Sequence, residues 1–300
     1  MKIIFAGGTG FIGSALTQAL VDRGDELILL SRSSSKKSDS KVRICRWDPS
    51  FGGGAWEKEL DGADAVINLA GEPITQRWTP AKKTSLCESR VQSVRAVIRA
   101  ISKAKRRPRV LLNASAVGYY GSRGDEILDE NSKPGFGFLP ELCRQWEDEV
   151  VKAELLGIRA IRIRIGIVLG KGGGALQKML PPFRLGIGGP LGSGKQWMSW
   201  IHQKDIVRLI LFLLDRAEAS GPFNAVSPDP SRMTDFAKTL GAVLRRPAIF
   251  PVPAFVLKIL LGEMSEMLLT GQRVLPQRAA QSGFSFQFPT LKLALEDILK

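Results

Sequence analysis

Three glycines near the start of the chain, Gly8, Gly10 and Gly13, have the spacing GxGxxG, and Gly7 adds a second register, GxxGxxG. Glycine lets a chain turn tightly and approach a phosphate closely, and backbone N–H groups at a helix N-terminus bind the negative charge. The spacing therefore predicts a site for the diphosphate of a dinucleotide. Seven residues would form this site: Gly7, Gly8, Thr9, Gly10, Phe11, Ile12 and Gly13.

The segment ELILLSR, at 26–32, determines which dinucleotide fits. An Asp or Glu at its end would bind the adenosine ribose hydroxyls, whereas an Arg suits a 2′-phosphate. The chain has Ser31 and Arg32 there and no acid before Asp39. A guanidinium can bind phosphate through two hydrogen bonds, so NADP is favoured over NAD as the cofactor. The alternative is that Arg32 only solvates a loop; Asp48 is a further candidate, for contact with the adenine.

The elements around the glycines have the order that a dinucleotide site requires. Residues 2–6 form a short apolar run, and SALTQALVDRG, at 14–24, has apolar residues at helical spacing and a glycine stop. With the strand at 26–32 this gives strand, glycine turn, helix and strand in about thirty residues. This context favours a dinucleotide-binding site over a purely structural glycine turn.

Composition excludes several classes of protein. No apolar stretch is long enough to span a bilayer, and three well-separated cysteines with one histidine indicate neither a disulfide framework nor a metal site. A cytoplasmic protein is therefore expected. The net charge of +14 raises the possibility of nucleic acid or an anionic membrane surface, but the basic residues are dispersed. The densest run, at 103–109, fits a solvated helix end, so neither nucleic acid nor membrane is predicted as a partner.

Later segments, in the same order along the chain, resemble the extended, epimerase-like branch of the short-chain dehydrogenase/reductase superfamily. They are ADAVINLAGE at 63–72, VLLNASAVGYYG at 110–121, IRIRIGIVLG at 161–170, WIHQKDIVRLILFLL at 200–214 and GPFNAVSP at 221–228. The resemblance implies an α/β fold, a Rossmann-type doubly wound parallel sheet with a smaller, mostly helical C-terminal substrate lobe. Residues 1–170 and 205–227 would form the NADP-binding domain, and residues 171–204 and 228–300 the lobe.

The glycine-rich segment at 169–200 and PQRAAQSGFSFQFP, at 276–289, resemble a narrower, little-characterised group of epimerase-family proteins with a small C-terminal domain of unknown function. The resemblance implies further cofactor contacts at Ser31, Arg32, Asn68, Leu69, Ala70, Ser85, Arg90, Arg164 and Val168. The residues themselves support two of these, because Asn68 and Leu69 end a strand at the edge where such folds bind ligands. Arg90 lies off the apolar stripe of its helix, so it can contact the cofactor; the alternative is that it is only a surface cation.

One stretch, FLPELCRQWE at 138–147, departs from the superfamily pattern. The superfamily uses a Tyr as acid and base and a Lys four residues later, whereas this chain has Leu139 and Cys143, or Phe138 and Leu142 if the alignment shifts by one. A phenol has a pKa near 10 and needs a nearby cation to act at neutral pH. The usual proton relay therefore cannot operate.

Substitutes for the relay lie before this stretch. Ser115 takes the place of the family's catalytic Ser, and Tyr119 and Tyr120, the only tyrosines in the chain, follow it. One tyrosine can pack under the nicotinamide while the other faces substrate; the alternative is that both only fill space beside Gly118 and Gly121. Cys143 can be an acid or an inert buried thiol.

Two functions follow from these alternatives. The first is an NADP(H)-binding atypical short-chain dehydrogenase/reductase, acting as an oxidoreductase or epimerase on a small-molecule substrate. The second is a non-catalytic NADP(H)-binding sensor or scaffold, which the missing Tyr and Lys favour. Further side chains that can meet a polar substrate are Arg184, Gln196 and Trp197. His202 and Asp205 are expected to stabilise the start of a helix. The oligomeric state is left open.

Overall fold

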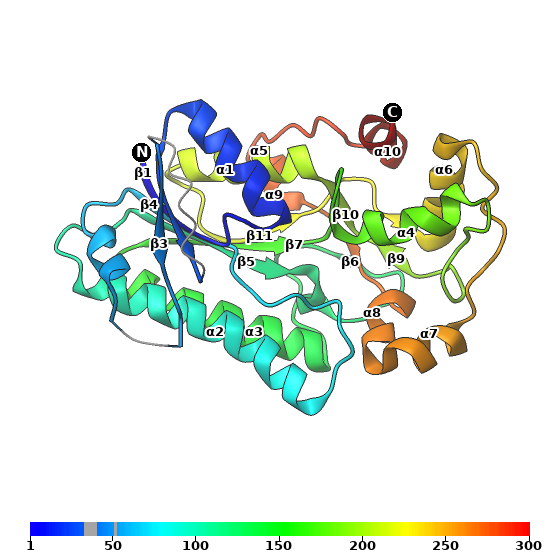
Figure 1. Cartoon of the computed structure of the whole chain (residues 1–300), viewed down its shortest axis with the longest axis horizontal. Coiled ribbons are helices and arrows are strands. Elements are labelled where there is room, and N and C mark those ends of the chain that lie inside the picture. Colours follow the sequence, from blue (N-terminus) through cyan, green and yellow to red (C-terminus); the bar gives the residue numbers. More distant parts are fainter. Residues whose placement is uncertain (33–40, 51–52) are drawn as a thin grey trace.

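Seven parallel strands form the central sheet, in the spatial order β11-β7-β5-β4-β1-β2-β3 (Figure 1). The computed structural model describes residues 1–32, 41–50 and 53–300. The strands are β1 (Lys2–Ala6), β2 (Glu26–Ser31), β3 (Val42–Arg46), β4 (Ala65–Asn68), β5 (Val110–Ala116), β7 (Arg159–Ile165) and β11 (Gly221–Ala225). They are short, and β1, β2 and β4 are almost wholly apolar because helices cover both faces of the sheet, whereas β3 and β7 contain arginines.

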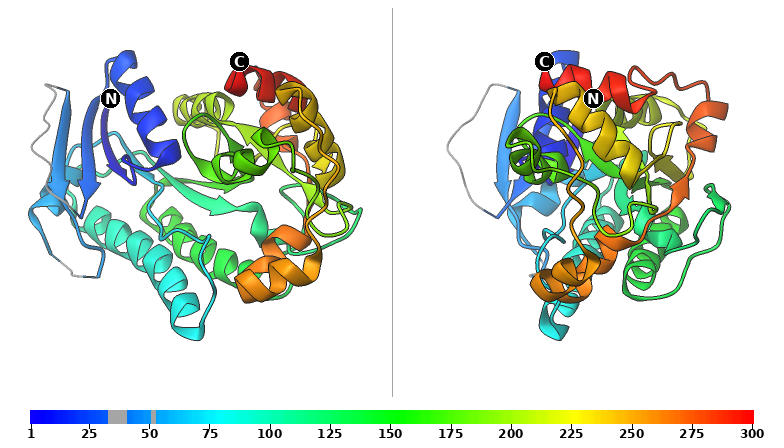
Figure 2. Two further views of the ribbon diagram at one scale, coloured as in Figure 1. Left: turned by 45° about the vertical axis from the view of Figure 1, so that its right-hand side comes forward. Right: turned by 90° about the vertical axis from the view of Figure 1, so that its right-hand side faces the viewer.

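Two pairs of helices make the outer layers (Figures 1 and 2). Helices α1 (Phe11–Arg23) and α5 (Gln203–Asp215) contact each other on one face, and α2 (Pro80–Lys103) and α3 (Phe138–Val151) contact each other on the opposite face. Each pair covers its own apolar core against the sheet. This confirms the predicted doubly wound α/β fold.

The remaining elements gather at the β11 side of the sheet and form a smaller lobe (Figure 2). Its helices are α4 (Gly174–Arg184), α6 (Met233–Leu244), α7 (Ala254–Leu261), α8 (Glu266–Leu269), α9 (Gln277–Gln281) and α10 (Leu291–Leu299). Three short strand pairs join the lobe to the rest: β8 (Ile167–Leu169) with β10 (Trp200–His202), β9 (Trp197–Met198) with β12 (Ser231–Arg232), and β6 (Ile127–Leu128) with β13 (Arg273–Val274). Short 3-10 turns complete the chain: η1 (Ala55–Leu60), η2 (Val117–Tyr120), η3 (Glu154–Leu156) and η4 (Gly262–Ser265).

The start of α5 fastens the end of the chain to the sheet. His202 caps the helix, its Nδ1 accepting from the Lys204 N–H at 3.0 Å. Asp205 is fully buried, and its carboxylate accepts from the backbone N–H groups of Gln287 and Phe288, both at 2.8 Å. The predicted role of His202 and Asp205 at a helix start is confirmed, and Asp205 also anchors the segment before α10.

The strand order changes direction between β1 and β4, where the chain passes from one half of the sheet to the other. At such a point the connections leave in opposite directions, and a crevice opens at the carboxyl ends of the strands. The glycine turn after β1 lies at this edge. Within the described ranges, no helix combines the length and apolarity that crossing a bilayer requires.

Candidate functional site

The glycine turn packs too tightly for larger side chains. Gly7 has φ +88°, and a Cβ on it would lie 2.7 Å from the Leu69 carbonyl carbon. A Cβ on Gly13 would lie 2.0 Å from the Gly7 carbonyl oxygen. The turn is therefore pressed against both the end of β4 and the first turn of α1, which explains why the sequence has glycine at these two positions.

The N-terminus of α1 is left open to a ligand. Gly10 caps the helix without a side-chain hydrogen bond, and the first turn contains no acidic residue. A Cβ on Gly10 would meet only the Gly7 oxygen, at 3.4 Å, so the Gly10 backbone borders open space. The first N–H groups of a helix have no partner within it and carry the positive end of the helix dipole. This terminus is therefore suited to an anion.

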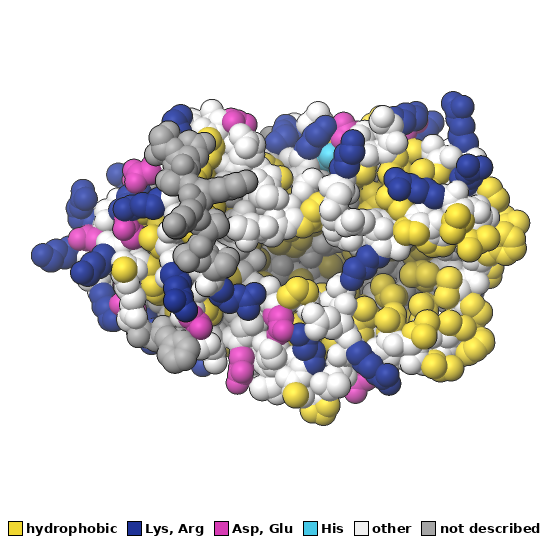
Figure 3. Space-filling model, viewed as in Figure 1, with side chains coloured by type: hydrophobic (Ala, Val, Ile, Leu, Met, Phe, Trp, Pro, Cys, Tyr) yellow, Lys and Arg dark blue, Asp and Glu magenta, His cyan; other side chains and the backbone are white. Residues whose placement is uncertain are grey.

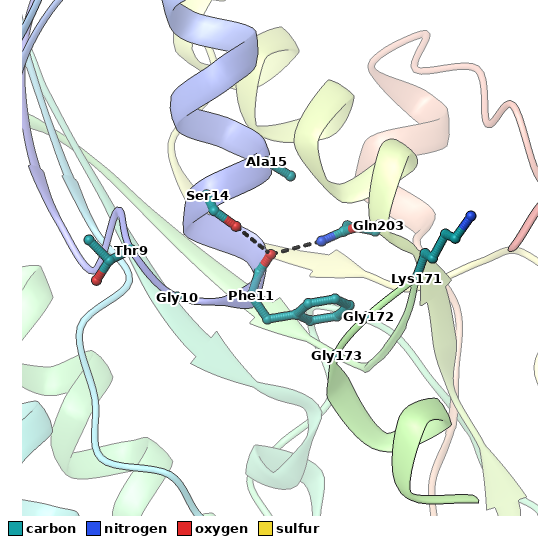
Figure 4. A pocket seen from close by; sticks show the side chains of 9 residues that line it. All are labelled: Thr9, Gly10, Phe11, Ser14, Ala15, Lys171, Gly172, Gly173 and Gln203. Carbon is teal, nitrogen blue, oxygen red and sulfur yellow. Dashed lines mark hydrogen bonds between the residues drawn. The ribbon is translucent and has the colours of Figure 1, made fainter. Parts of the chain in front are cut away.

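A cavity of about 590 Å³ opens beside this helix terminus (Figure 4). It is lined by Thr9, Gly10, Phe11, Ser14, Ala15, Lys171, Gly172, Gly173 and Gln203. Figure 4 shows the Gln203 side chain reaching from α5 to the Phe11 carbonyl oxygen, at 2.7 Å. Lys171 is the one cation in the lining, so the wall facing α1 adds positive charge. Sequence reasoning missed Lys171, although its segment, GKGGGA, was marked by its glycine density.

The two residues predicted to bind the adenosine end lie at the ends of neighbouring strands. Ser31 ends β2, opposite Arg46 of β3, and Arg32 follows it as an exposed side chain. Arg32 has no ion pair within residues 1–32, 41–50 and 53–300; residues 33–40, which supply the rest of the basic run, lie outside that set. Asp48 is exposed and accepts from the Ser50 N–H at 2.9 Å. Cofactor contact by these residues stays a prediction.

The side chain of Asn68 forms its hydrogen bonds within the protein. Its side chain is fully buried and donates to Ser93 Oγ at 3.1 Å and to Asn113 Oδ1 at 2.7 Å, while its Oδ1 accepts from the Ala70 N–H at 3.1 Å. Every polar atom of the amide is already used within the protein, and the predicted cofactor contact of Asn68 stays a prediction. Asn68 instead fixes the end of β4, which holds Leu69 and Ala70 against the glycine turn.

Ser85 and Arg90, on α2, bind the loop that leaves β4. The Ser85 hydroxyl and the Lys82 ammonium both donate to the Glu72 carboxylate, and Arg90 Nη2 donates to the Glu72 carbonyl at 3.0 Å. The Arg90 guanidinium also lies over the Trp146 ring, 5.3 Å from its centroid, and burial lowers the pKa of Arg90 below its usual range. Their cofactor contacts stay predictions; the contacts seen here position the loop.

Leu139 and Cys143 occupy the place where the superfamily relay would be. A Cβ on Gly118, just beyond the end of β5, would lie 3.4 Å from Leu139 Cβ and 3.8 Å from Cys143 Sγ. This contact supports the first of the two alignments, in which Leu139 and Cys143 replace Tyr and Lys. Burial raises the pKa of the Cys143 thiol to about 12, so this cysteine is a neutral, packed thiol at physiological pH.

Ser115 points into the protein. Its hydroxyl donates to Glu147 Oε1 at 2.7 Å, and both residues are almost completely buried. A hydroxyl that orients a substrate carbonyl must donate to that carbonyl, and the Ser115 proton is already donated to a carboxylate. In this arrangement Ser115 fixes α3 against β5, and its predicted role in orienting a substrate stays a prediction.

Arg164 has the same inward orientation. Its Nε and Nη2 donate to the two carboxylate oxygens of Glu147 at 2.8 and 2.9 Å, and its Nη1 donates to the Tyr120 hydroxyl at 2.9 Å. The side chain is about 4% exposed. These donors are used within the protein, and the predicted cofactor contact of Arg164 stays a prediction. Val168, also predicted as a cofactor contact, packs in the apolar core beneath α1 and α5.

The two tyrosines differ in accessibility. Tyr120 is fully buried, donates to Asn224 Oδ1 at 2.6 Å and accepts from Arg164; burial raises the pKa of Tyr120 far above its usual range. The Tyr120 hydroxyl is occupied within the protein, and its predicted catalytic role stays a prediction. Tyr119 is half-buried, with the Arg164 guanidinium 3.6 Å from its ring centroid, and burial raises the pKa of Tyr119 as well. Tyr119 remains the candidate for contact with a substrate.

The lobe residues predicted to meet substrate have different surroundings. Gln196 donates to the carbonyls of Leu191 and Leu268, at 2.9 and 2.7 Å, and so joins two segments of the lobe. Trp197 lies between two guanidinium groups, those of Arg232 at 4.4 Å and Arg273 at 4.7 Å from its ring. Arg184 is exposed at the end of α4. The structure does not bring these three together with Tyr119.

Comparison with known proteins gives consistent results. Residues 3–226 match the model of the NAD dependent epimerase/dehydratase family, and residues 252–298 match a domain of unknown function. A chloroplastic homologue of epimerase family protein SDR39U1 from Arabidopsis thaliana is 43% identical, covering 100% of this chain and 87% of that protein. The epimerase family protein YfhF of Bacillus subtilis is 39% identical, covering 100% and 98%.

Among solved structures, human epimerase family protein SDR39U1, crystallised with NADPH, superposes with a TM-score of 0.89 and 37% identity over 99% of both chains. Three findings indicate the same family: sequence identity above 30% over whole chains, the match to the family model, and the parallel sheet with its glycine turn. The chain belongs to the NAD-dependent epimerase/dehydratase family.

Proposed function

We propose that the chain binds NADP(H), with the diphosphate at the N-terminus of α1 and the 2′-phosphate at Arg32. The observation that carries the proposal is the open helix terminus, with no capping side chain, no acid in its first turn and a glycine backbone that borders open space. Arg32 is an exposed cation directly after β2, the position that distinguishes NADP from NAD. The similar human protein was crystallised with NADPH, which supports the same choice here.

Titration calorimetry of the purified chain with NADPH and NADH tests this proposal. NADPH should bind at least tenfold more tightly than NADH. The substitution Arg32→Asp should weaken NADPH binding by tenfold or more and leave NADH within about threefold, because only the 2′-phosphate contact is lost. Arg99→Asp, an exposed cation on α2 far from the turn, is the matched control. Equal losses for both coenzymes would remove Arg32 from the cofactor site.

For the reaction we propose an oxidoreductase or epimerase acting on a small molecule. The coenzyme supplies hydride chemistry when bound, and Tyr119 is the proton donor or acceptor that this chain offers to a substrate. Burial raises the pKa of Tyr119, and the charge of the Arg164 guanidinium, which lies against its ring, lowers that pKa by less. The apolar pair Leu139 and Cys143 packs the side of the corner that a Tyr and Lys would occupy.

A non-catalytic NADP(H)-binding sensor or scaffold is the second candidate. It is favoured by the hydrogen bonds at the end of β5, where the polar side chains are paired within the protein. These side chains, which we call the closed corner, are Ser115, Tyr120, Glu147 and Arg164. NADPH oxidation against a panel of carbonyl compounds and sugar nucleotides separates the two. Turnover that Tyr119→Phe reduces at least tenfold supports the enzyme. Tight NADPH binding with no turnover on any member of the panel supports the sensor.

A further inference from the structure

Two segments of the lobe form a continuous apolar face. Residues 184–192 and 250–252 run side by side, with backbone hydrogen bonds from Phe250 N to Gly188 O at 3.2 Å and from Val252 N to Pro190 O at 2.9 Å. Helix α7 follows directly. We call this surface the lobe face. Its exposed apolar side chains, with their exposed fractions, are Leu185 75%, Ile187 59%, Ile249 71%, Phe250 52%, Phe255 64%, Ile259 69% and Leu260 65%.

Helix α7 contributes most of this face. Its sequence is AFVLKILL, with one charged residue in eight, and Leu257 is the only residue of it that is buried. A surface helix of a globular protein normally presents polar residues to water and turns its apolar ones inward. Phe255, Ile259 and Leu260 do the opposite. Contiguous exposed apolar side chains of this kind mark an interaction site.

The charge around the lobe face has one sign. Residues 184–192 and 245–261 contain Arg184, Arg245, Arg246 and Lys258 and no Asp or Glu. All four cations are exposed, and none has an ion-pair partner among the residues that the structure describes. Figure 3 shows hydrophobic side chains gathered on the right of the molecule, with Lys and Arg around them and few acidic groups. Elsewhere on the chain, exposed cations are commonly paired, as Arg144 is with Glu141 and Asp148.

We propose that the lobe face binds the surface of an anionic lipid bilayer. The exposed Phe, Ile and Leu side chains would enter the interface between headgroups and acyl chains, while the four cations bind lipid phosphates. A second copy of the chain fits less well, because a two-fold contact of this face would bring its unpaired cations together. The prediction of no membrane partner rested on the dispersed basic residues and the absence of a spanning segment; a peripheral contact needs no spanning segment, and the lobe face combines four cations with exposed apolar side chains.

Co-sedimentation of the full chain with vesicles tests the proposal. Vesicles of phosphatidylcholine with about 30% phosphatidylglycerol should bind the chain at least tenfold more strongly than phosphatidylcholine alone at physiological salt, because neutral vesicles lack the counter-charge. The variant Phe250→Ser/Phe255→Ser/Ile259→Ser removes apolar side chains, and Arg245→Glu/Arg246→Glu reverses two charges. Each should reduce binding to anionic vesicles at least tenfold. Because all five side chains are exposed, thermal unfolding should stay unchanged.

Two matched controls lie outside the lobe face. Leu155→Ser removes an apolar side chain that is 85% exposed, and Arg99→Glu/Lys105→Glu reverses two exposed charges on α2 and the turn after it. Both should bind vesicles like the parent chain. Equal losses from the controls would show that net charge alone drives binding and would overturn the proposal. It is also overturned if the parent binds neither vesicle type, or if it is a dimer that only the triple variant dissociates.

Discussion

The two ends of the candidate site use their polar groups in opposite ways. At the α1 end, the backbone N–H groups have no side-chain cap and border open space. At the β5 end, Ser115, Glu147, Arg164 and Tyr120 form a closed chain of hydrogen bonds between 2.6 and 2.9 Å long. The α1 end leaves hydrogen-bond donors open to a ligand, whereas the side chains at the β5 end use their polar atoms within the protein.

This difference separates binding from chemistry. Donors at a helix N-terminus are free by geometry, whatever the side chains are. Side chains that act on a substrate must keep a hydrogen-bonding position open, and burial with full pairing removes it. The chain therefore keeps the features of a coenzyme site while its reacting corner is stabilised as a structural core, with Tyr119 at its margin.

The largest effect should come from Gly13→Ala, which tests the open end. Its Cβ would lie 2.0 Å from the Gly7 oxygen, so the turn must move away from the helix. We expect NADPH affinity to fall by 100-fold or more, about 2.7 kcal/mol. Gly10→Ala is the control, because its Cβ meets only one atom, at 3.4 Å. That variant should unfold like the parent and lose about tenfold in affinity, measured by calorimetry.

Substitutions at the closed end should change the free energy of unfolding instead of NADPH affinity. Arg164→Met leaves the Glu147 carboxylate buried without its bidentate partner, which costs about 3–5 kcal/mol of unfolding free energy. The double variant Glu147→Leu/Arg164→Met should recover much of that loss, because no charge remains buried. Urea unfolding of the three chains measures both values. A loss below about 1 kcal/mol for Arg164→Met would show that the corner is not the structural core described here.

The two tyrosines should differ from each other in their effect on stability, and both effects should be smaller than that of Arg164→Met. Tyr120→Phe leaves Asn224 Oδ1 without its donor and should cost about 1–3 kcal/mol, while coenzyme affinity stays unchanged. Tyr119→Phe should change stability by less than about 0.5 kcal/mol, because its ring contact with Arg164 survives. If Tyr120→Phe is the variant that abolishes turnover at unchanged stability, the two roles are reversed.

The smallest effect concerns pH. Burial lowers the pKa of His202 below its ordinary value of 6.5, and its Nδ1 must be unprotonated to cap α5. Since the folded pKa is the lower one, this contribution to stability is complete above pH 6.5 and is lost as the pH falls below it. His202→Asn keeps a capping oxygen without titrating, so its stability should change less between pH 7 and pH 5. Denaturant midpoints at the two pH values measure the difference; identical slopes for both chains would contradict it.

The sequence predicted the glycine turn at the open end but not the hydrogen-bond partners at the closed end, for one physical reason. Gly7, Gly10 and Gly13 act through the backbone, so their spacing alone specifies the turn. The partners of Ser115 and Arg164 depend on which helix packs beside β5, and Glu147 lies 32 and 17 residues away from them. Lys171 was missed for the same reason, because it reaches the cavity only through tertiary packing.

Asp205 links the end of the chain to the coenzyme cavity. Its buried carboxylate accepts hydrogen bonds from the N–H groups of Gln287 and Phe288 and pairs with Arg208, and Gln203, two residues earlier in α5, donates to the Phe11 carbonyl at the cavity wall. A polypeptide cut before residue 287 would leave the Asp205 carboxylate without two of its hydrogen-bond donors, close to the contact between Gln203 and Phe11. Removing that segment should therefore loosen the wall of the cavity, although the segment lies far from the glycine turn in the sequence.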